Sequence, residues 1–244
     1  MQNRYVGDIG DYVKLAILRA LASGPQERRL GVAWWLFPDE NRGGDGEHRE
    51  YVDRPEDWKR FDPELFQVLV TINKSGQRHV RALEDPTILP SAIFARDPIP
   101  CTASPFKLRP LERIRWITEI STRLKGCDLV FLDPDNGIAP EGLKMTQRRA
   151  GKSVTIEDIA ALTQHNRTIA IYHHQTHRKG GNLQELRDLA KRLRKSKLQV
   201  SGALRAKPWS PRAFFILNGN PEIHNRAETI VETWEGWISW YPDL

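Results

Sequence analysis

The sequence predicts one α/β domain over residues 1–244, built on a doubly wound, mainly parallel sheet. Runs of consecutive apolar residues, bounded by turn-forming residues, are typical of strands that are buried on both faces. Segments with helical periodicity separate these runs, and strand–helix alternation favours a parallel sheet. The predicted strands cover residues 30–36, 129–132, 168–172, 198–204 and 213–217. The predicted helices cover residues 15–21, 63–73, 111–124, 156–163, 183–195 and 227–240.

Length, charge and cysteine content limit the class of protein. A chain of 244 residues suits one α/β domain with an insertion or two small domains. The net charge of +6 and the pI of about 9.4 favour an anionic partner such as nucleic acid. No apolar run reaches transmembrane length, and charged residues interrupt the first apolar stretch, so we expect neither a membrane span nor a signal peptide. Cys101 and Cys127 form neither a disulfide framework nor a Cys-x-x-Cys metal pair, which is typical of a cytoplasmic protein.

Two Gly-Asp pairs, three residues apart, precede the first predicted helix. Gly7-Asp8 and Gly10-Asp11 are followed by Lys14. One aspartate is explained as a helix cap, because an aspartate there accepts a hydrogen bond from a backbone N–H that has no partner within the helix. A cap explains neither the second aspartate nor Lys14. We therefore predict that Gly7, Asp8, Asp11 and Lys14 line the entrance of a cofactor or substrate site.

The segment after the first predicted strand carries acidic side chains. In Rossmann-like folds an acidic residue at a strand end often binds the ribose of the cofactor, and Asp39 or Glu40 has that position here. The polar segment that follows, residues 41–48, matches neither a Walker A loop nor a dinucleotide fingerprint. It is either a loop that covers a ligand or binds phosphate, or an ordinary surface loop.

Residues 50–110 are predicted to form an inserted lobe or cap. Six prolines between residues 86 and 110 exclude long helices or strands from the second half of this segment. Helical periodicity resumes at residue 111 and places apolar side chains on one face of a helix that leads into the central strand. These side chains are Leu111, Ile114, Ile117, Ile120 and Leu124.

Polar side chains directly follow two of the predicted strands. After residues 129–132 come Asp133, Pro134, Asp135 and Asn136, and after residues 168–172 come His173, His174 and, further on, His177. Ligands of open α/β sheets bind at the carboxyl ends of the strands. These two strand ends are therefore the predicted location of any chemistry, although a turn without function uses the same residue types.

Several blocks of sequence, in the same order along the chain, resemble the RlmJ-type ribosomal RNA adenine-N6 methyltransferases. The opening Arg-Tyr-x-Gly-Asp-x-Gly-Asp-x-x-Lys, residues 4–14, resembles their Gly-Asn-x-x-Asp-x-x-Lys-His start. Residues 45–51 resemble their Gly-Glu-Tyr segment, and residues 129–134 resemble the strand that leads to Asp-Pro-Pro-Tyr. Residues 169–173 and 214–218 resemble their next strand and their last strand. The resemblance spans nearly the whole chain and implies a class I S-adenosylmethionine methyltransferase fold.

The resemblance implies an enzyme that uses S-adenosylmethionine to methylate an adenine amino group in nucleic acid. Asp133 and Pro134 would accept hydrogen bonds from that amine, and Asn136 would assist. Members of the family stack a tyrosine on the flipped base, but Asp-Pro-Pro-Tyr is replaced here by Asp-Pro-Asp-Asn, so that Tyr172 or a tryptophan must supply the ring. The chain also lacks the glycine-rich loop after the first strand, since no glycine occurs between that strand and Gly43.

Two other classes of function remain open. Asp133, Asp135, His173 and His174 would suit Mg or Mn in a metal-dependent nuclease or phosphohydrolase. An apolar strand followed by Asp-x-Asp is also similar to the motif of haloacid dehalogenase-like phosphatases. Adjacent residues of a strand, such as His173 and His174, point to opposite faces, and His177 lies in a loop, so we expect at least one of the three histidines to be structural or solvent-exposed. The other class is a nucleotide or nucleic-acid binder that has lost its catalytic activity.

The predicted helix over residues 183–195 has one strongly basic face. That face carries Arg187, Lys191, Arg192, Arg194 and Lys195. We predict that four of them, Arg187, Lys191, Arg194 and Lys195, contact phosphates, the alternative being a solvated helix face.

Overall fold

The computed structural model describes residues 1–24, 28–40, 46–163, 167–176, 179–242 and 244. Most of the loop expected over residues 41–48, and also His177, lie outside the described residues. The helices are α1 (Ile9–Ala22), α2 (Pro55–Trp58), α3 (Pro63–Ser75), α4 (Arg109–Arg123), α5 (Ile156–Leu162), α6 (Gly181–Lys195) and α7 (Pro221–Thr233). The strands are β1 (Leu30–Ala33), β2 (Ile93–Ala95), β3 (Leu129–Leu132), β4 (Gly137–Ile138), β5 (Ser153–Val154), β6 (Thr168–His174), β7 (Val200–Ala206), β8 (Arg212–Leu217) and β9 (Ile238–Tyr241).

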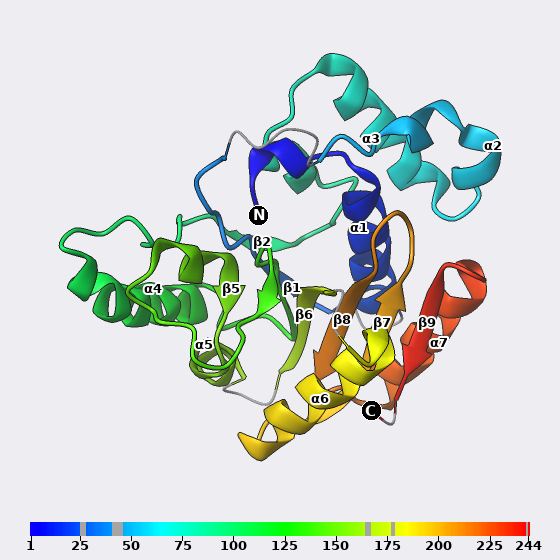
Figure 1. The fold of residues 1–244 in the computed structure, drawn as a ribbon. Coiled ribbons are helices and arrows are strands. Elements are labelled where there is room, and N and C mark those ends of the chain that lie inside the picture. Colours follow the sequence, from blue (N-terminus) through cyan, green and yellow to red (C-terminus); the bar gives the residue numbers. More distant parts are fainter. Residues whose placement is uncertain (25–27, 41–45, 164–166, 177–178, 243) are drawn as a thin grey trace.

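The centre of the fold is a seven-stranded sheet with the order β2-β1-β3-β6-β8-β7-β9 (Figure 1). β2, β1, β3 and β6 are mutually parallel, as the apolar runs predict. β8 is antiparallel to both β6 and β7, and β9 is antiparallel to β7. Five of the seven strands therefore run in one direction, and the reversed strands lie in the half of the sheet beyond β6.

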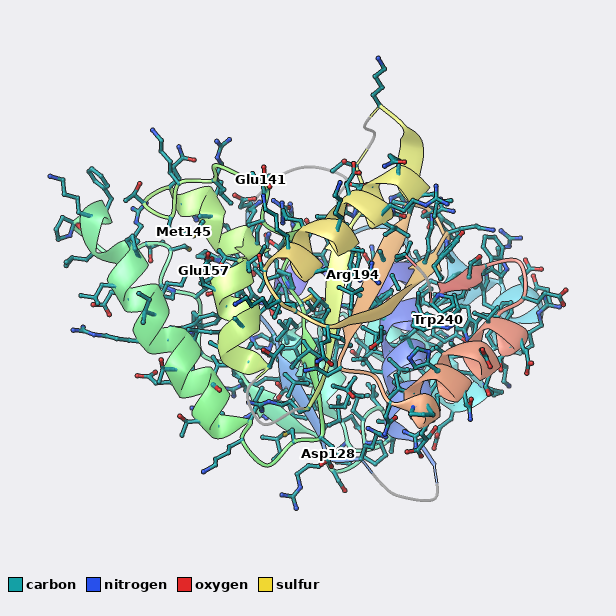
Figure 2. All side chains as sticks on the ribbon, turned by 90° about the horizontal axis from the view of Figure 1, so that it is seen from below. Asp128, Glu141, Met145, Glu157, Arg194 and Trp240 are labelled. Atoms are coloured by element: carbon teal, nitrogen blue, oxygen red, sulfur yellow. The ribbon has the colours of Figure 1, made fainter. Side chains whose placement is uncertain are left out.

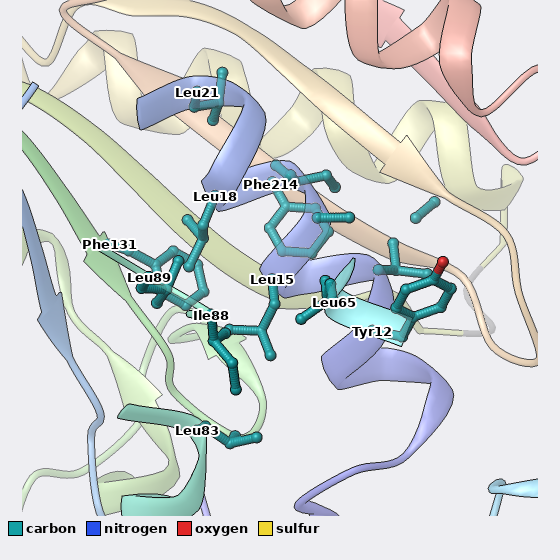
Figure 3. Packing of buried hydrophobic residues seen from close by; sticks show 14 of the residues in the cluster. Tyr12, Leu15, Leu18, Leu21, Leu65, Leu83, Ile88, Leu89, Phe131 and Phe214 are labelled. Atoms are coloured by element: carbon teal, nitrogen blue, oxygen red, sulfur yellow. The ribbon is translucent and has the colours of Figure 1, made fainter. Parts of the chain in front are cut away.

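Helices cover both faces of the sheet, which is the doubly wound arrangement that the sequence predicts. Successive side chains of β3 enter different cores: Leu129 and Phe131 pack with α1, whereas Val130 and Leu132 pack on the other side. Figure 3 shows the first core, where Phe131 and Phe214 of the sheet face Leu15 and Leu18 of α1. Figure 2 shows α6 and α7 on opposite sides of the sheet.

The segment over residues 50–110 is joined to the main fold at two places. Leu65 and Leu69 of α3 belong to the same buried cluster as α1. β2 lies within this segment and pairs with β1 as an edge strand of the central sheet. The helical part of the segment therefore packs on the face of the sheet that α1 covers.

Two helices differ from the sequence prediction. The tail is not one helix over residues 227–240: α7 ends at Thr233, Gly236 turns the chain at a φ of 81°, and residues 238–241 pair with β7 as β9. In α4, Leu111 and Ile114 are 47% and 62% exposed instead of buried. The helix is rotated because Arg113 enters the core, where its Nε donates to the Asp158 carboxylate at 3.1 Å.

Candidate active site

A cavity of about 450 Å³ lies at the carboxyl ends of β3 and β6. Its walls come from six parts of the chain: the N-terminal segment up to Lys14, residues 46–48, the turn over residues 133–136, Lys152, the end of β6, and residues 210–212 between β7 and β8. The turn is fixed between β3 and the small β4–β5 sheet, where the Asn136 N–H donates to the Lys152 carbonyl at 2.8 Å. The Gly-Asp segment before Lys14 and the central turn therefore meet at the carboxyl ends of the strands, where open α/β sheets bind their ligands.

Lys14 joins the N-terminal segment to the central turn. Its Nζ lies 2.7 Å from Asp11 Oδ1 and 2.9 Å from Asp133 Oδ2. Lys14, Asp11 and Asp133 are only 4%, 1% and 3% exposed. Buried charges of this kind persist only when they are paired, and here one ammonium serves two carboxylates.

Burial and ion pairing shift the pKa values of Lys14, Asp11 and Asp133 in opposite directions. Burial raises the pKa of Asp133 above its ordinary value, although Lys14 and the terminal ammonium oppose it. The pKa of Asp11 is raised by burial too, and Asp8 contributes in the same direction. Burial alone would lower the pKa of Lys14, but the two carboxylates outweigh it and raise that pKa. Lys14 is therefore a fixed ammonium at neutral pH.

The two Gly-Asp pairs have separate structural roles. Asp8 is the cap of α1, since its Oδ1 accepts a hydrogen bond from the Asp11 N–H at 2.9 Å. Asp11 accepts a bond from the Gly7 N–H at 3.0 Å, and Gly7 has the positive φ of 78° that this turn requires. Asp8, Asp11 and Lys14 line the cavity as predicted, whereas Gly7 lies behind them and shapes the turn.

Asp135 is paired with the terminal amine. The Met1 ammonium lies 2.8 Å from Asp135 Oδ1 and donates to the carbonyl oxygens of Trp35 and Asp133, each at 3.0 Å. The ammonium outweighs the effect of burial and, with Gln2 and Lys152, lowers the pKa of Asp135. Met1 thus lies across the ends of β1 and β3.

Asp39 and Glu40 do not line the cavity, and their contact with a cofactor ribose stays a prediction. Asp39 accepts hydrogen bonds from the backbone N–H and side-chain amide of Asn3, at 2.8 and 3.0 Å. Glu40 forms an ion pair with Lys152. The Asp39 carboxylate therefore binds the N-terminal segment, and the Glu40 carboxylate joins the segment after β1 to Lys152.

His173 and His174 point to opposite faces of β6, as predicted. His173 is structural: its Nδ1 accepts a hydrogen bond from the Ile138 N–H at 3.1 Å, and its Nε2 lies 3.5 Å from Glu185. His174 lines the cavity, with its Nδ1 3.5 Å from the hydroxyl of Tyr172. Burial raises the pKa of Tyr172 to about 12, although Arg212 and Lys14 oppose that shift, so its hydroxyl is protonated at neutral pH.

The four residues expected as metal ligands are not brought together. Asp133 is bound to Lys14, Asp135 is bound to the terminal amine, and His173 faces away from the cavity. Within the described ranges, no group of three or more His, Cys, Asp or Glu side chains is placed to hold a metal ion.

The cavity keeps several hydrogen-bonding groups for a ligand. Asp133 Oδ1, the second oxygen of Asp8 and the side chain of Asn136 have no partner among the residues that the structure describes. These acceptors surround the central turn, so the site is equipped to receive a donor such as an amine.

Sequence reasoning missed the contribution of the β7–β8 connection. Ser210 and Arg212 line the cavity, and Trp209 is 44% exposed beside them. Its ring centroid is 6.1 Å from that of His48, another residue of the cavity wall. One signal was present in the sequence, because Arg212 is a charged residue that directly precedes an apolar run.

On the basic face of α6, two of the arginines are engaged within the chain. Arg192 donates to the Ala139 carbonyl at 2.5 Å, and Arg194 donates to the carbonyl oxygens of Leu244 and Val200. Arg187, Lys191 and Lys195 are exposed. No helix among the described residues is long and apolar enough to span a membrane. Comparisons of the chain with protein-family models, curated proteins and solved structures find no match.

Proposed function

We propose that this chain is an S-adenosylmethionine-dependent methyltransferase that acts on an amino group in nucleic acid. The observation that carries the proposal is Asp133, a residue of the cavity wall: Lys14 holds its Oδ2, and its Oδ1 has no donor among the described residues. A carboxylate fixed in this way is an acceptor for a substrate amine and needs no reorganisation when the amine arrives.

The arrangement of the sheet supports the same proposal. The resemblance implies a class I methyltransferase fold, in which a reversed strand lies next to the last parallel strand of the core. β8 has that position between β6 and β7. The central turn follows β3, between β1 and β6, at the carboxyl edge of the parallel half.

Each wall of the cavity has a role in this proposal. Asp133 Oδ1 and the Pro134 carbonyl accept the two hydrogens of the amine, and Asn136 lies beside them. Lys14 opposes the effect of burial, which raises the pKa of Asp133, and holds the carboxylate in place. Tyr172 at the cavity wall, or Trp209 at its rim, supplies the ring that stacks on the base.

One hydrogen-bond acceptor of the cavity also fits part of the cofactor. The second oxygen of Asp8 has no partner among the described residues and would accept the ribose hydroxyls or the ammonium group of S-adenosylmethionine. When bound, the cofactor supplies an electrophilic methyl group. The residues of this chain orient the amine and exclude water from it.

One observation favours a second candidate, a nucleic-acid binder without methyl transfer. Met1 bridges the ends of β1 and β3 by two hydrogen bonds of 3.0 Å and occupies the place of the glycine-rich loop. A chain with that space closed would bind nucleic acid but not the cofactor.

Binding of S-adenosylhomocysteine separates the two candidates. The methyltransferase should bind it, with measurable heat in calorimetry and a higher melting temperature, because a ligand of the native state stabilises that state. Transfer of a labelled methyl group to RNA or DNA is the second readout. The absence of both heat and a thermal shift at millimolar ligand would contradict methyl transfer, and retained binding of nucleic acid would then establish the second candidate.

A further inference from the structure

Arg212 differs from three other cations of the cavity, Lys14, the Met1 ammonium and Lys152, because it has no carboxylate partner within the described part of the chain. Lys14 is paired with Asp11 and Asp133, the Met1 ammonium with Asp135, and Lys152 with Glu40. Arg212 is nevertheless only 6% exposed. A guanidinium at that depth needs a compensating group, and the cavity is where such a group would lie.

The guanidinium is held rigidly with one edge unused. Its Nη1 donates to the carbonyl oxygens of Pro208 and Ser210, at 2.7 and 2.9 Å. Its Nε and Nη2 donate to no atom of the described residues. These two N–H groups form the parallel pair with which an arginine binds two oxygens of one anion.

The N-terminus of α1 lies directly against this edge. A methyl group in place of the Gly10 hydrogen would come within 2.8 Å of Arg212 Nη2 and 2.9 Å of Nε. The Gly10 N–H, in the first turn of this 14-residue helix, has no acceptor among the described residues. Free N–H groups at a helix N-terminus attract anions, and the helix dipole adds to the attraction. The second glycine of the Gly-Asp-x-Gly-Asp segment thus allows the guanidinium to approach the helix.

We propose that Arg212 and the N-terminus of α1 form a subsite for a phosphate group. Arg212 Nε and Nη2 and the Gly10 N–H donate to the phosphate oxygens, and the Ser210 hydroxyl lies on the same wall. The subsite rests on the proposed function in one respect, which is that the phosphate belongs to the nucleotide whose base enters the cavity. Asp8 also lines the cavity and repels an anion, so the attraction depends on Arg212.

Two variants test the subsite from opposite sides. Arg212→Gln removes the charge, and Gly10→Ala leaves the charge but pushes the guanidinium out of place. Gly10 does not have a positive φ, and alanine is the better helix former, so Gly10→Ala should fold even if loss of Arg212 unfolds the β7–β8 connection. Arg115→Gln on α4 is the matched control, because it removes the same charge from an exposed side chain that does not line the cavity.

Calorimetry with inorganic phosphate, adenosine monophosphate and adenosine is the measurement. Wild type and Arg115→Gln should bind adenosine monophosphate at least about tenfold more tightly than adenosine, as charge-assisted hydrogen bonds predict. Gly10→Ala and Arg212→Gln should lose that preference and their affinity for inorganic phosphate. Failure of the wild type to bind phosphate, or unchanged binding in a folded Gly10→Ala variant, would overturn the subsite.

Two further ligands identify the source of the phosphate and separate this inference from methyl transfer. A short oligonucleotide that binds more tightly than adenosine monophosphate, with the same dependence on Arg212, identifies a nucleic-acid backbone, whereas equal affinity identifies a free nucleotide. S-adenosylhomocysteine carries a carboxylate and no phosphate, so its binding should not change in Arg212→Gln. If that variant loses S-adenosylhomocysteine but keeps phosphate, Arg212 serves the cofactor and the subsite is wrong. If no variant binds S-adenosylhomocysteine but the phosphate results hold, the subsite stands without methyl transfer.

Discussion

The cavity and the outer face of α6 both carry clustered charges, but the charges are held in different ways. In the cavity, Lys14 contacts Asp11 and Asp133, and all three side chains are almost fully buried. On α6, Arg187, Lys191 and Lys195 are exposed, and their side chains form no hydrogen bond or ion pair with the described residues. A buried charge depends on its specific partner, whereas an exposed charge is hydrated and contributes mainly to long-range attraction. Substitutions in the cavity should therefore change activity and stability strongly and specifically. Substitutions on α6 should have small effects that add up.

The two aspartates of the central turn should show the largest difference in activity. Asp133→Ala removes the proposed acceptor of the amine and should abolish methyl transfer. Asp135→Asn replaces a residue that binds the terminal amine, so a substantial part of the activity should remain. Methyl transfer by both proteins is the measurement, with circular dichroism to verify folding.

Chelation provides the control for this pair. Methyl transfer should survive exhaustive treatment with EDTA. If EDTA stops turnover, Mg or Mn restores it, and the two substitutions are equally damaging, then a metal-dependent hydrolase replaces the methyltransferase.

Lys14→Met should cause the largest loss of stability. It leaves Asp11 and Asp133 as buried carboxylates without their cation, which typically lowers the free energy of unfolding by about 3–5 kcal/mol. The control, Lys191→Met on α6, should change it by less than about 0.5 kcal/mol. Urea unfolding at pH 7 measures both, and equal effects would show that the cavity charges are not coupled.

The pH dependence of the Lys14→Met variant has a definite sign. Burial already raises the pKa values of Asp11 and Asp133, and loss of the ammonium raises them further. A carboxyl whose pKa is higher in the folded state than in the unfolded state favours folding at low pH, and this contribution disappears as pH rises through the raised pKa. The difference in the free energy of unfolding between the wild type and Lys14→Met should therefore decrease as pH falls from 7 towards 4.

Local pattern was sufficient to predict five of the seven strands of the central sheet and the central turn, but not β2, β9 or the partners of the cavity charges. The apolar runs of β3 and β6 and the alternation of His173 and His174 are local signals, and the structure confirms them. Arg212 and Met1 line the cavity beside residues that are distant from them in the sequence, and no local pattern encodes such contacts. The rotation of α4 has the same cause, since the burial of Arg113 depends on Asp158.

Glu185 tests a buried pair outside the cavity. Burial alone would raise the pKa of Glu185 above its ordinary value of 4.5. Interactions with His173 and Thr176 outweigh burial and lower this pKa to about 2. A depressed carboxyl pKa stabilises the fold above pH 4.5, and this contribution is lost as pH falls towards 2. Glu185→Gln should therefore have a flatter stability profile between those values than the wild type. Thermal melts from pH 2 to 6 measure this, and an unchanged slope, equal to that of the exposed control Glu232→Gln, would contradict the role of the pair.

Replacing Arg187, Lys191 and Lys195 by glutamine should have the smallest effect of these substitutions, a weaker binding of oligonucleotides. Arg194 is left unchanged because it binds two carbonyl groups of the chain. If α6 contacts phosphates as its sequence predicts, the variant should bind an oligonucleotide more weakly, and the slope of affinity against salt should fall by about one for each lost contact. Binding of adenosine monophosphate should not change, because a mononucleotide reaches only the cavity. An unchanged salt slope would show that α6 is a solvated helix face. A loss of mononucleotide binding would show instead that the two regions are coupled, which the contrast between buried and exposed charges does not allow.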